Sequence, residues 1–199
     1  MLASLLDEEY TLEQVSSFLR ATPFSPSISA MKSGWIRLAE ESMVLAGKRE
    51  WETRLERKLS QTQRRAEMLT EQEGEDFAPL SAPNRQLEQG RALQSFLAEL
   101  FEVLDTANKA TKWQSAVGIL WEYYRTQIEM DEEFADLTLQ LEHAGVLDQA
   151  EVPRTSKGLK EYLHATLEAP GMRLGAFGTG TPLIAPREQC IGAAFRHVF

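Results

Sequence analysis

The stretch LQSFLAELFEVLDTANKATKWQSAVGILWEYY, residues 93–124, carries the strongest structural signal in the chain. Its first half repeats apolar side chains at the three- and four-residue intervals of one helix face, which is typical of an amphipathic helix. A second helical pattern follows a short polar break, and the Thr111 hydroxyl is well placed to cap it. The predicted inward-facing residues are Leu87, Leu93, Phe96, Leu97, Leu100, Phe101 and Leu104 in the first helix, and Trp113, Val117, Leu120, Trp121 and Tyr124 in the second. Two such neighbouring helices predict a helical bundle.

The helical period continues toward the N-terminus. Thr11 is predicted to cap a short amphipathic helix. Residues 21–34, ATPFSPSISAMKSG, contain two prolines, four serines and a glycine, which predicts a loop. Ser33 is predicted to cap the next helix, which Gly47 would end. A charged helix with inward-facing Trp51, Leu55 and Leu59 is then predicted from residue 48 to about residue 70.

Turn-forming residues divide the rest of the helical region. Residues 71–84, EQEGEDFAPLSAPN, combine four acids, a glycine and two prolines, so they predict a linker or exposed loop that ends where Asn84 begins the next helix. A further helix is predicted over residues 131–143, closing at Gly145. Ser156 is predicted to cap a short final helix.

The character of the sequence changes after residue 170. The segment PGMRLGAFGTGTP, residues 170–182, holds four glycines, and short extended pieces are predicted at residues 183–185 and 195–199. The predicted fold is mainly α: an irregular multi-helix bundle of six or seven helices over residues 1–170, with a sub-boundary at the loop 71–83. A Gly-rich loop and a short β-strand tail are predicted over residues 171–199.

Composition restricts the class of protein. Of the 199 residues, 43% are hydrophobic and 26% are charged, which is ordinary for a soluble globular protein. No apolar run approaches the roughly 18–20 residues that cross a bilayer, so no membrane association is predicted. The start, MLASLLDEEY, lacks the basic region of a signal peptide. A single cysteine, Cys190, excludes an internal disulfide, and we expect a cytoplasmic protein.

The charge distribution contains one basic stretch in an acidic chain. The net charge is −9, from 21 basic and 30 acidic residues, so the isolated chain is not expected to bind nucleic acid strongly. Residues 48–65, KREWETRLERKLSQTQRR, nevertheless hold seven basic and three acidic residues. Two interpretations stay open, a solvated helix face with Glu–Arg pairs or a stripe that contacts phosphates. The candidate nucleic-acid contacts are Lys48, Arg49, Arg54, Arg57, Lys58, Arg64 and Arg65.

No catalytic constellation is visible in the sequence. The segment GAFGTGTP has no lysine after Gly180, which a phosphate-binding loop requires. His143, His164 and His197 lie far apart without metal-ligand spacing, and Cys190 has no evident activating partner. The four tryptophans lie on apolar helix faces, which predicts core packing rather than base stacking. We therefore expect no catalytic residue, metal or cofactor, and neither ATP hydrolysis nor DNA cleavage by this chain.

Three stretches, in order, are similar to one family. VSSFLRATPF (residues 15–24) precedes GWIRLAEESMVLAGKREWETRL (residues 34–55), the helix–break–helix pattern of residues 93–124 follows, and the chain ends in GAAFRHVF (residues 192–199). This order resembles the helical segment of AddB/RecC-like proteins, which belong with the UvrD/Rep helicases and carry PD-(D/E)XK nucleases. In that family a strand of the form G-L-x-F-x-x-V-F follows the helical insertion and enters the second RecA-like motor domain.

The tail also departs from the family pattern. An active helicase of this group carries T-x-H-x-x-K-G-L-E-F before the strand. Here Ala185, Pro186 and Arg187 lie in that stretch and Ile191 precedes Gly192, so the histidine and lysine are missing. The resemblance therefore implies a degenerate motor. The family strand runs on into a G-L-x-E-G-x-F-P turn that is absent here, so we expect the chain to be cut from a larger protein whose motor domain follows.

The resemblance implies a non-catalytic helical domain of a DNA-repair helicase/nuclease protein that guides DNA or contacts a partner helicase/nuclease subunit. The parent protein would be of the ATP-dependent helicase/exonuclease kind, with its phosphate loop and nuclease carboxylates outside these residues. The alternative is an independent all-helical module for protein–protein interaction, of the adaptor or secretion-gatekeeper type. A third possibility is an enzyme whose site the sequence does not reveal.

Overall fold

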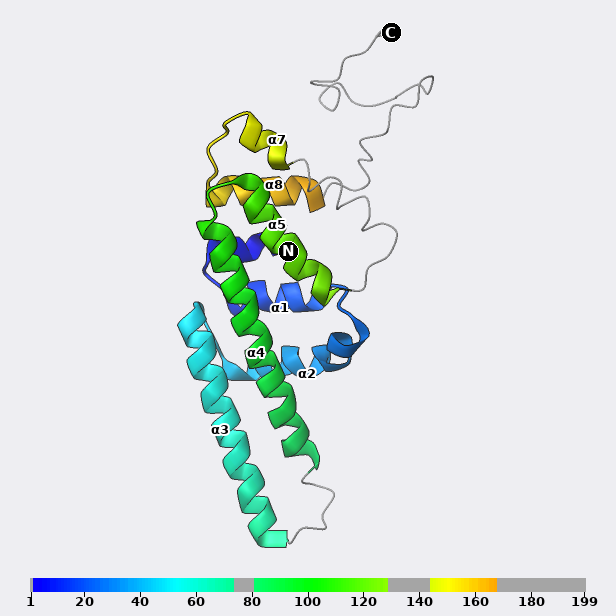
Figure 1. Cartoon of the computed structure of the whole chain (residues 1–199). Helices are drawn as coiled ribbons and strands as arrows, with labels where there is room; N and C mark the ends of the chain where they lie inside the picture. Colours follow the sequence, from blue (N-terminus) through cyan, green and yellow to red (C-terminus); the bar gives the residue numbers. More distant parts are fainter. Residues whose placement is uncertain (1, 74–80, 129–143, 168–199) are drawn as a thin grey trace, which may run out of the picture. The chain divides into compact units, whose positions relative to one another are not determined.

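A computed structural model describes residues 2–73, 81–128 and 144–167 of the chain (Figure 1). Over these ranges it contains seven α-helices and no named β-strand, so the predicted mainly helical fold is confirmed. The chain divides into two compact units, Met1–Ala169 and Pro170–Phe199, and every described residue belongs to the first. Within the described part, no helix is both long enough and apolar enough to cross a membrane.

One long helix organises the others. The elements are the 3-10 helix η1 (Leu2–Asp7) and the α-helices α1 (Leu12–Ala21), α2 (Pro26–Ser42), α3 (Lys48–Glu73), α4 (Ser81–Lys109), α5 (Trp113–Gln127), α7 (Ala144–Gln149) and α8 (Ser156–Leu167). α3 and α4 run side by side in opposite directions (Figure 1). α4 also contacts α2, α5 and η1, while α8 packs on η1 and α5. α4 is therefore the central element of the bundle.

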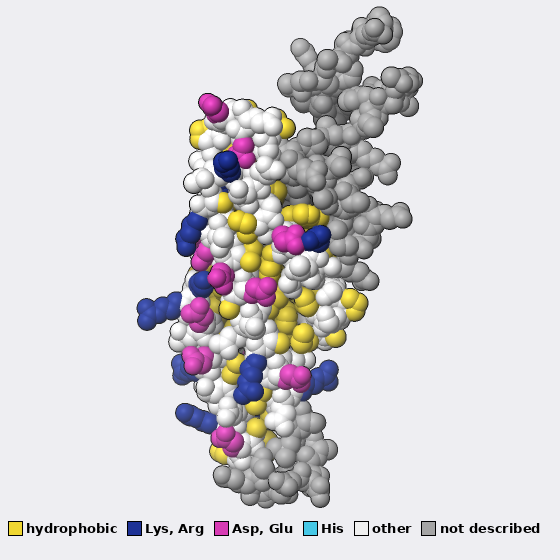
Figure 2. Space-filling model, in the orientation of Figure 1, with side chains coloured by type: hydrophobic (Ala, Val, Ile, Leu, Met, Phe, Trp, Pro, Cys, Tyr) yellow, Lys and Arg dark blue, Asp and Glu magenta, His cyan; other side chains and the backbone are white. Residues whose placement is uncertain are grey.

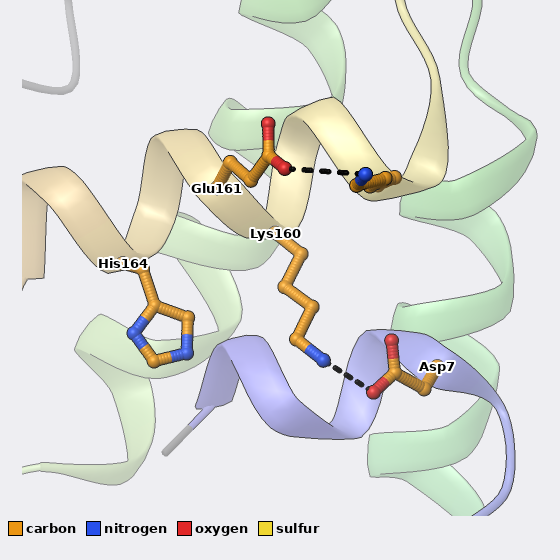
Figure 3. A pocket seen from close by; sticks show the side chains of 5 residues that line it. Asp7, Lys160, Glu161 and His164 are labelled. Carbon is orange, nitrogen blue, oxygen red and sulfur yellow. Dashed lines mark hydrogen bonds and ion pairs between the residues drawn. The ribbon is translucent and has the colours of Figure 1, made fainter.

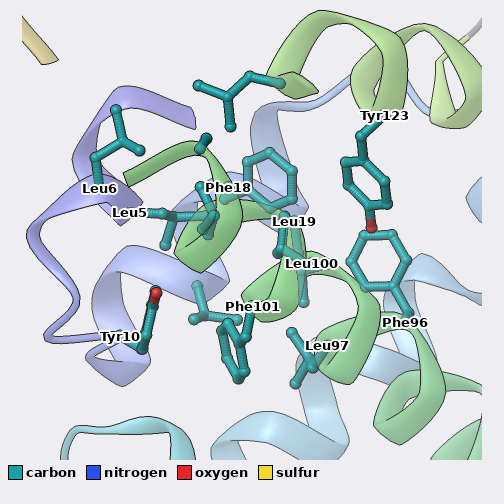
Figure 4. Packing of buried hydrophobic residues seen from close by; sticks show 14 of the residues in the cluster. Leu5, Leu6, Tyr10, Phe18, Leu19, Phe96, Leu97, Leu100, Phe101 and Tyr123 are labelled. Atoms are coloured by element: carbon teal, nitrogen blue, oxygen red, sulfur yellow. The ribbon is translucent and has the colours of Figure 1, made fainter. Parts of the chain in front are cut away.

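The hydrophobic core lies around the C-terminal half of α4 (Figure 4). Leu100, Phe101 and Leu104 are at most 1% exposed, as the amphipathic pattern predicted. Leu5 of η1 and Phe18 of α1 join the same cluster. Burying each such side chain stabilises the fold by about 1.5–3 kcal/mol. The part played by η1 was not predicted, because six residues are too few to show a helical period.

Several local predictions are confirmed. The Thr11 hydroxyl accepts the Gln14 backbone N–H at 3.2 Å, and the Gln14 side-chain oxygen accepts the Thr11 N–H at 2.9 Å, which forms a complete capping box. α3 begins at Lys48, as its charged helical pattern indicated. Three of the four tryptophans are core residues, namely Trp35, Trp51 and Trp113.

The loop predicted over residues 21–34 is wrong in its second half. α2 begins at Pro26, well before Ser33. Proline suits the first helical position, because its φ angle is already helical and its missing N–H would have no partner there. Ile28 and Met31 then pack against the core. This packing outweighs the serine content on which the loop prediction depended.

Two helix boundaries also differ from the predictions. α2 ends at Ser42, where Met43 takes a left-handed conformation with φ 53°, so Gly47 does not end that helix. Gly47 instead has φ 92° and shapes the turn into α3. α4 begins at Ser81 rather than at Asn84. Its early proline is tolerated since the first turn of a helix needs no N–H donor from that residue.

A distant carboxylate caps α5 in place of the predicted Thr111. The N-cap position is Lys112, which makes no side-chain cap bond. Asp148 of α7 instead accepts the backbone N–H groups of Trp113 at 2.8 Å and Gln114 at 3.0 Å. A carboxylate at this point also compensates the positive end of the helix dipole. Sequence spacing could not predict this cap, because its donor and acceptor lie 34 or 35 positions apart.

The last helices begin at other residues than predicted. Thr155, not Ser156, supplies the hydroxyl that accepts the Gly158 N–H at 3.0 Å at the start of α8. Gly145 lies inside α7 and does not close a helix. The helix predicted over residues 131–143, most of the loop 71–83, the Gly-rich loop and the strand-like tail fall outside the described residues.

Candidate nucleic-acid interface

α3 has one buried face and one solvent face. Trp51, Leu55 and Leu59 recur at four-residue intervals on the buried face, and Thr62 and Ala66 continue that row along the helix. Within the described residues, α3 packs mainly on α4 and α2, and the Trp51 Nε1–H also donates to the Tyr10 carbonyl oxygen at 2.6 Å. The face opposite the buried row is therefore left to solvent. The seven predicted nucleic-acid contacts all lie on this helix, but in different surroundings.

Three of the seven basic side chains are engaged in ion pairs within the protein. Lys48 Nζ lies 3.2 Å from the Asp105 carboxylate of α4. Lys58 Nζ lies 2.7 Å from the Glu41 carboxylate of α2. Arg54 pairs with Glu50 one turn earlier, at 3.2 Å. Of these three pairs, only Arg54–Glu50 is a Glu–Arg pair within α3, whereas Lys48 and Lys58 pair with carboxylates of other helices.

The other four basic residues are exposed and form no ion pair with any other described residue. They are Arg49, Arg57, Arg64 and Arg65. Figure 2 shows basic side chains projecting along α3, with acidic side chains interleaved among them. The helix therefore separates its basic residues into a paired group and an unpaired group, a division that the sequence did not predict.

Arg57 and Arg64 line one shallow hollow on the outer face of α3. The complete lining is Thr53, Glu56, Arg57, Ser60, Gln61 and Arg64. Between the two guanidinium groups, the Ser60 hydroxyl and the Gln61 amide can donate hydrogen bonds to an anion. The negative charge of Glu56 in the same lining disfavours anion binding. The lining residues follow helical spacing in the sequence, so the hollow could have been predicted from it. A pattern of basic residues identifies only Arg57 and Arg64, however, and not the uncharged donors between them.

The carboxylate of Glu50 holds Arg54 and the start of α3 in place. The pKa of Glu50 is lowered, chiefly because the Ala46 N–H donates a hydrogen bond to the ionised form. Partial burial opposes this shift, while the Leu45 N–H and the nearby Arg54 guanidinium add to it. Glu50 therefore stays ionised at neutral pH and keeps Arg54 engaged.

A second polar hollow lies between η1 and α8, and it contains no catalytic arrangement (Figure 3). Lys160 extends to Asp7 and forms an ion pair with it. Lys157 lies 3.8 Å from Glu161 on the exposed side of α8. His164 lines the same hollow and has a further interaction of its own. The charges here neutralise each other in pairs, which favours a role in holding η1 against α8.

No metal centre is formed by the residues in view. Across residues 2–73, 81–128 and 144–167, no group of three or more His, Cys, Asp or Glu side chains converges as metal ligands would. His143 and His197, like Cys190, lie outside these ranges.

Comparison of the chain with protein-family models, with curated proteins and with solved structures finds no match.

Proposed function

We propose that the chain is a non-catalytic helical domain of a cytoplasmic DNA-repair helicase/nuclease protein of the AddB/RecC type, and that the outer face of α3 contacts the DNA backbone. The ordered resemblance of residues 15–55, 93–124 and 192–199 supports the family. On this proposal the domain guides DNA beside a RecA-like motor domain and contacts a partner subunit. Any ATP-dependent helicase or exonuclease chemistry belongs to other parts of the parent protein.

The proposed DNA-contacting surface is chosen because of two exposed arginines on α3. Arg57 and Arg64 are exposed, lie in one hollow and have no acidic partner within the described residues. Seven residues along an α-helix correspond to a rise of about 10.5 Å. That separation exceeds the axial spacing of about 3.4 Å between successive phosphates of one duplex strand, so the two guanidinium groups lie far enough apart to reach different phosphates. Each guanidinium could therefore bind a separate phosphate through two parallel hydrogen bonds.

Charge reversal on the full chain tests this surface. Binding of short fluorescent single-stranded and duplex DNA would be measured by anisotropy at about 50 mM salt, where phosphate contacts are strong. We expect weak binding by the native chain and at least a tenfold loss in the double variant Arg57→Glu/Arg64→Glu. The melting temperature should be nearly unchanged, because both side chains are exposed.

A second double variant with the same change in net charge shows whether DNA affinity depends on the α3 face or on the total charge of the chain. Arg20→Glu/Arg125→Glu alters the total charge equally but lies on α1 and α5, where both arginines form exposed ion pairs that contribute little to stability. It should retain most of the affinity for DNA. An equal loss in both double variants would mean that overall charge, not the α3 face, governs binding. Undiminished binding by the α3 variant would exclude this face as the interface.

A further inference from the structure

The loop between α2 and α3, residues 43–47, exposes two large apolar side chains. Leu45 is 76% exposed and Met43 is 70% exposed, the highest values among the exposed large hydrophobic residues of the described part. Val44 between them is only 2% exposed and belongs to the core. The loop thus inserts Val44 into the protein and turns the residues on both sides of it toward solvent.

Hydrogen bonds fix the backbone of this loop. The Leu45 and Ala46 N–H groups both donate to the Glu50 carboxylate at 3.0 Å. The Gly47 N–H donates to the Glu9 carbonyl oxygen at 2.6 Å, and the Met43 N–H donates to the Glu40 carbonyl oxygen at 3.2 Å. Because the loop backbone is already fixed, binding through its apolar side chains costs little additional backbone entropy.

Met43 occupies a backbone position that favours glycine. Its φ of 53° lies in the left-handed region, which is strained for a residue with a Cβ atom. Glycine would end α2 without this strain. Since the Met43 side chain is largely exposed, burial within this unit does not account for it either. Strain and exposure at one residue together point to a use for the side chain outside this unit.

Basic groups border the loop on the side of α3. A hollow beside it is lined by Ala46, Gly47, Lys48, Arg49, Glu50, Thr53 and Arg54. Lys48 and Arg54 are already engaged by Asp105 and Glu50, whereas Arg49 is exposed without an ion pair to a described residue and offers its charge to a partner. Charge complementarity therefore favours a partner that combines apolar side chains with carboxylates.

We propose that residues 43–47 are the docking site for an acidic amphipathic helix of a partner protein. Its apolar stripe packs on Leu45 and Met43, which enter the spaces between side chains three and four residues apart. A glutamate beside that stripe pairs with Arg49. Leu45, Met43 and Arg49 do not line the Arg57–Arg64 hollow, although Thr53 lines both hollows, so the proposed contacts with the peptide differ from those with DNA.

A designed peptide tests the site on the full chain. The probe is a fluorescent, alanine-rich helical peptide with leucines at i, i+3, i+4 and i+7 and glutamates beside that stripe, and its control replaces every glutamate with lysine. We expect the acidic peptide to bind at least tenfold more tightly than the basic one. Leu45→Ser should weaken it at least tenfold, whereas Val146→Ser, at a 55% exposed valine of α7, should not.

The same variants distinguish the other outcomes. Met43→Gly should weaken peptide binding while leaving the melting temperature equal or higher, because it relieves the backbone strain. DNA affinity should be unchanged in Leu45→Ser. Equal binding of both peptides, or no effect of Leu45→Ser, would overturn the proposal. If the native chain does not bind the peptide and Leu45→Ser lowers DNA affinity, the loop contacts nucleic acid. That result would also overturn the proposal.

Discussion

The two halves of α4 meet very different surroundings, although they belong to one continuous helix. From Leu93 onward the helix buries a broad apolar stripe, namely Leu93, Phe96, Leu97, Leu100, Phe101, Leu104 and Ala107. Between residues 82 and 92, only Gly90 is buried. The buried residues of α3 at that end are Leu59, Thr62 and Ala66. They are fewer than the residues of the α4 stripe, and they include a small alanine and a polar threonine.

The C-terminal part of α4 therefore contributes mainly to the stability of the fold, whereas the other end of the α3–α4 pair leaves side chains exposed for binding. In the C-terminal half, several helices converge on α4, and its side chains are committed to the core. At the other end, α3 and α4 approach so closely that a Cβ atom on Gly90 would lie 2.2 Å from the Leu59 side chain. The face of α3 opposite that contact stays exposed and carries Arg57 and Arg64. The following predictions test this division, in order of decreasing expected effect.

The largest effect is expected in the core. Leu100→Ala should lower the free energy of unfolding by about 3–5 kcal/mol, because it leaves a cavity in a fully buried cluster. Leu59→Ala, toward the other end, should cost about 2 kcal/mol or less, since fewer groups surround it. Urea unfolding of both variants measures the contrast. Equal losses would show that the two halves of the hairpin are equally well packed.

A smaller effect is expected at Arg154, in the connection between α7 and α8, which is hydrogen-bonded to the end of α4. The Arg154 guanidinium donates hydrogen bonds to the carbonyl oxygens of Ala107, Asn108 and Ala110 at 2.6–2.7 Å, at the end of α4. Such a cation also favours the negative end of the helix dipole. Arg154→Ala should cost about 2 kcal/mol in urea unfolding, and Arg154→Lys less, because lysine keeps the charge but not the fork. A loss below about 0.5 kcal/mol would contradict this role.

Alkaline pH should lower the stability of the fold, because three tyrosines are buried or partly buried in or against the core. Burial raises the pKa of Tyr10, Tyr123 and Tyr124, and the neighbouring Asp105 raises that of Tyr10 as well. Above pH about 10 the unfolded chain loses tyrosine protons that the folded chain keeps, so stability falls as pH rises. The urea midpoint should therefore decrease between pH 9 and 11, roughly the range around the ordinary tyrosine pKa. Tyr10→Phe should reduce that decrease, and a midpoint independent of pH would refute the explanation.

The sequence predicted those parts of the fold that depend on local spacing. The stripe on α4, the Thr11 capping box and the start of α3 at Lys48 could all be recognised within about one or two helical turns. The Asp148 cap and the Arg154 contacts could not, because they join residues 34 to 47 positions apart.

The candidate site shows the same limit. The sequence located all seven basic residues on one helix, but it could not show which of them form ion pairs. Asp105 and Glu41, the partners of Lys48 and Lys58, lie on other helices and are brought to α3 by the tertiary fold. The unpaired status of Arg57 and Arg64 is therefore a property of the packed structure and not of their spacing.

The most direct test of this account is the salt dependence of single-stranded DNA binding by the full chain. Each phosphate contact contributes about 0.7 to the slope of log Kobs against log salt concentration. Arg57→Ala/Arg64→Ala should therefore reduce the slope by about 1.4. Lys48→Ala/Lys58→Ala, which removes two ion-paired lysines, should change it by less than about 0.5, because those charges are already compensated. An equal reduction in both variants, or a reduction only in the lysine variant, would contradict the claim that ion pairing decides which face of α3 meets DNA.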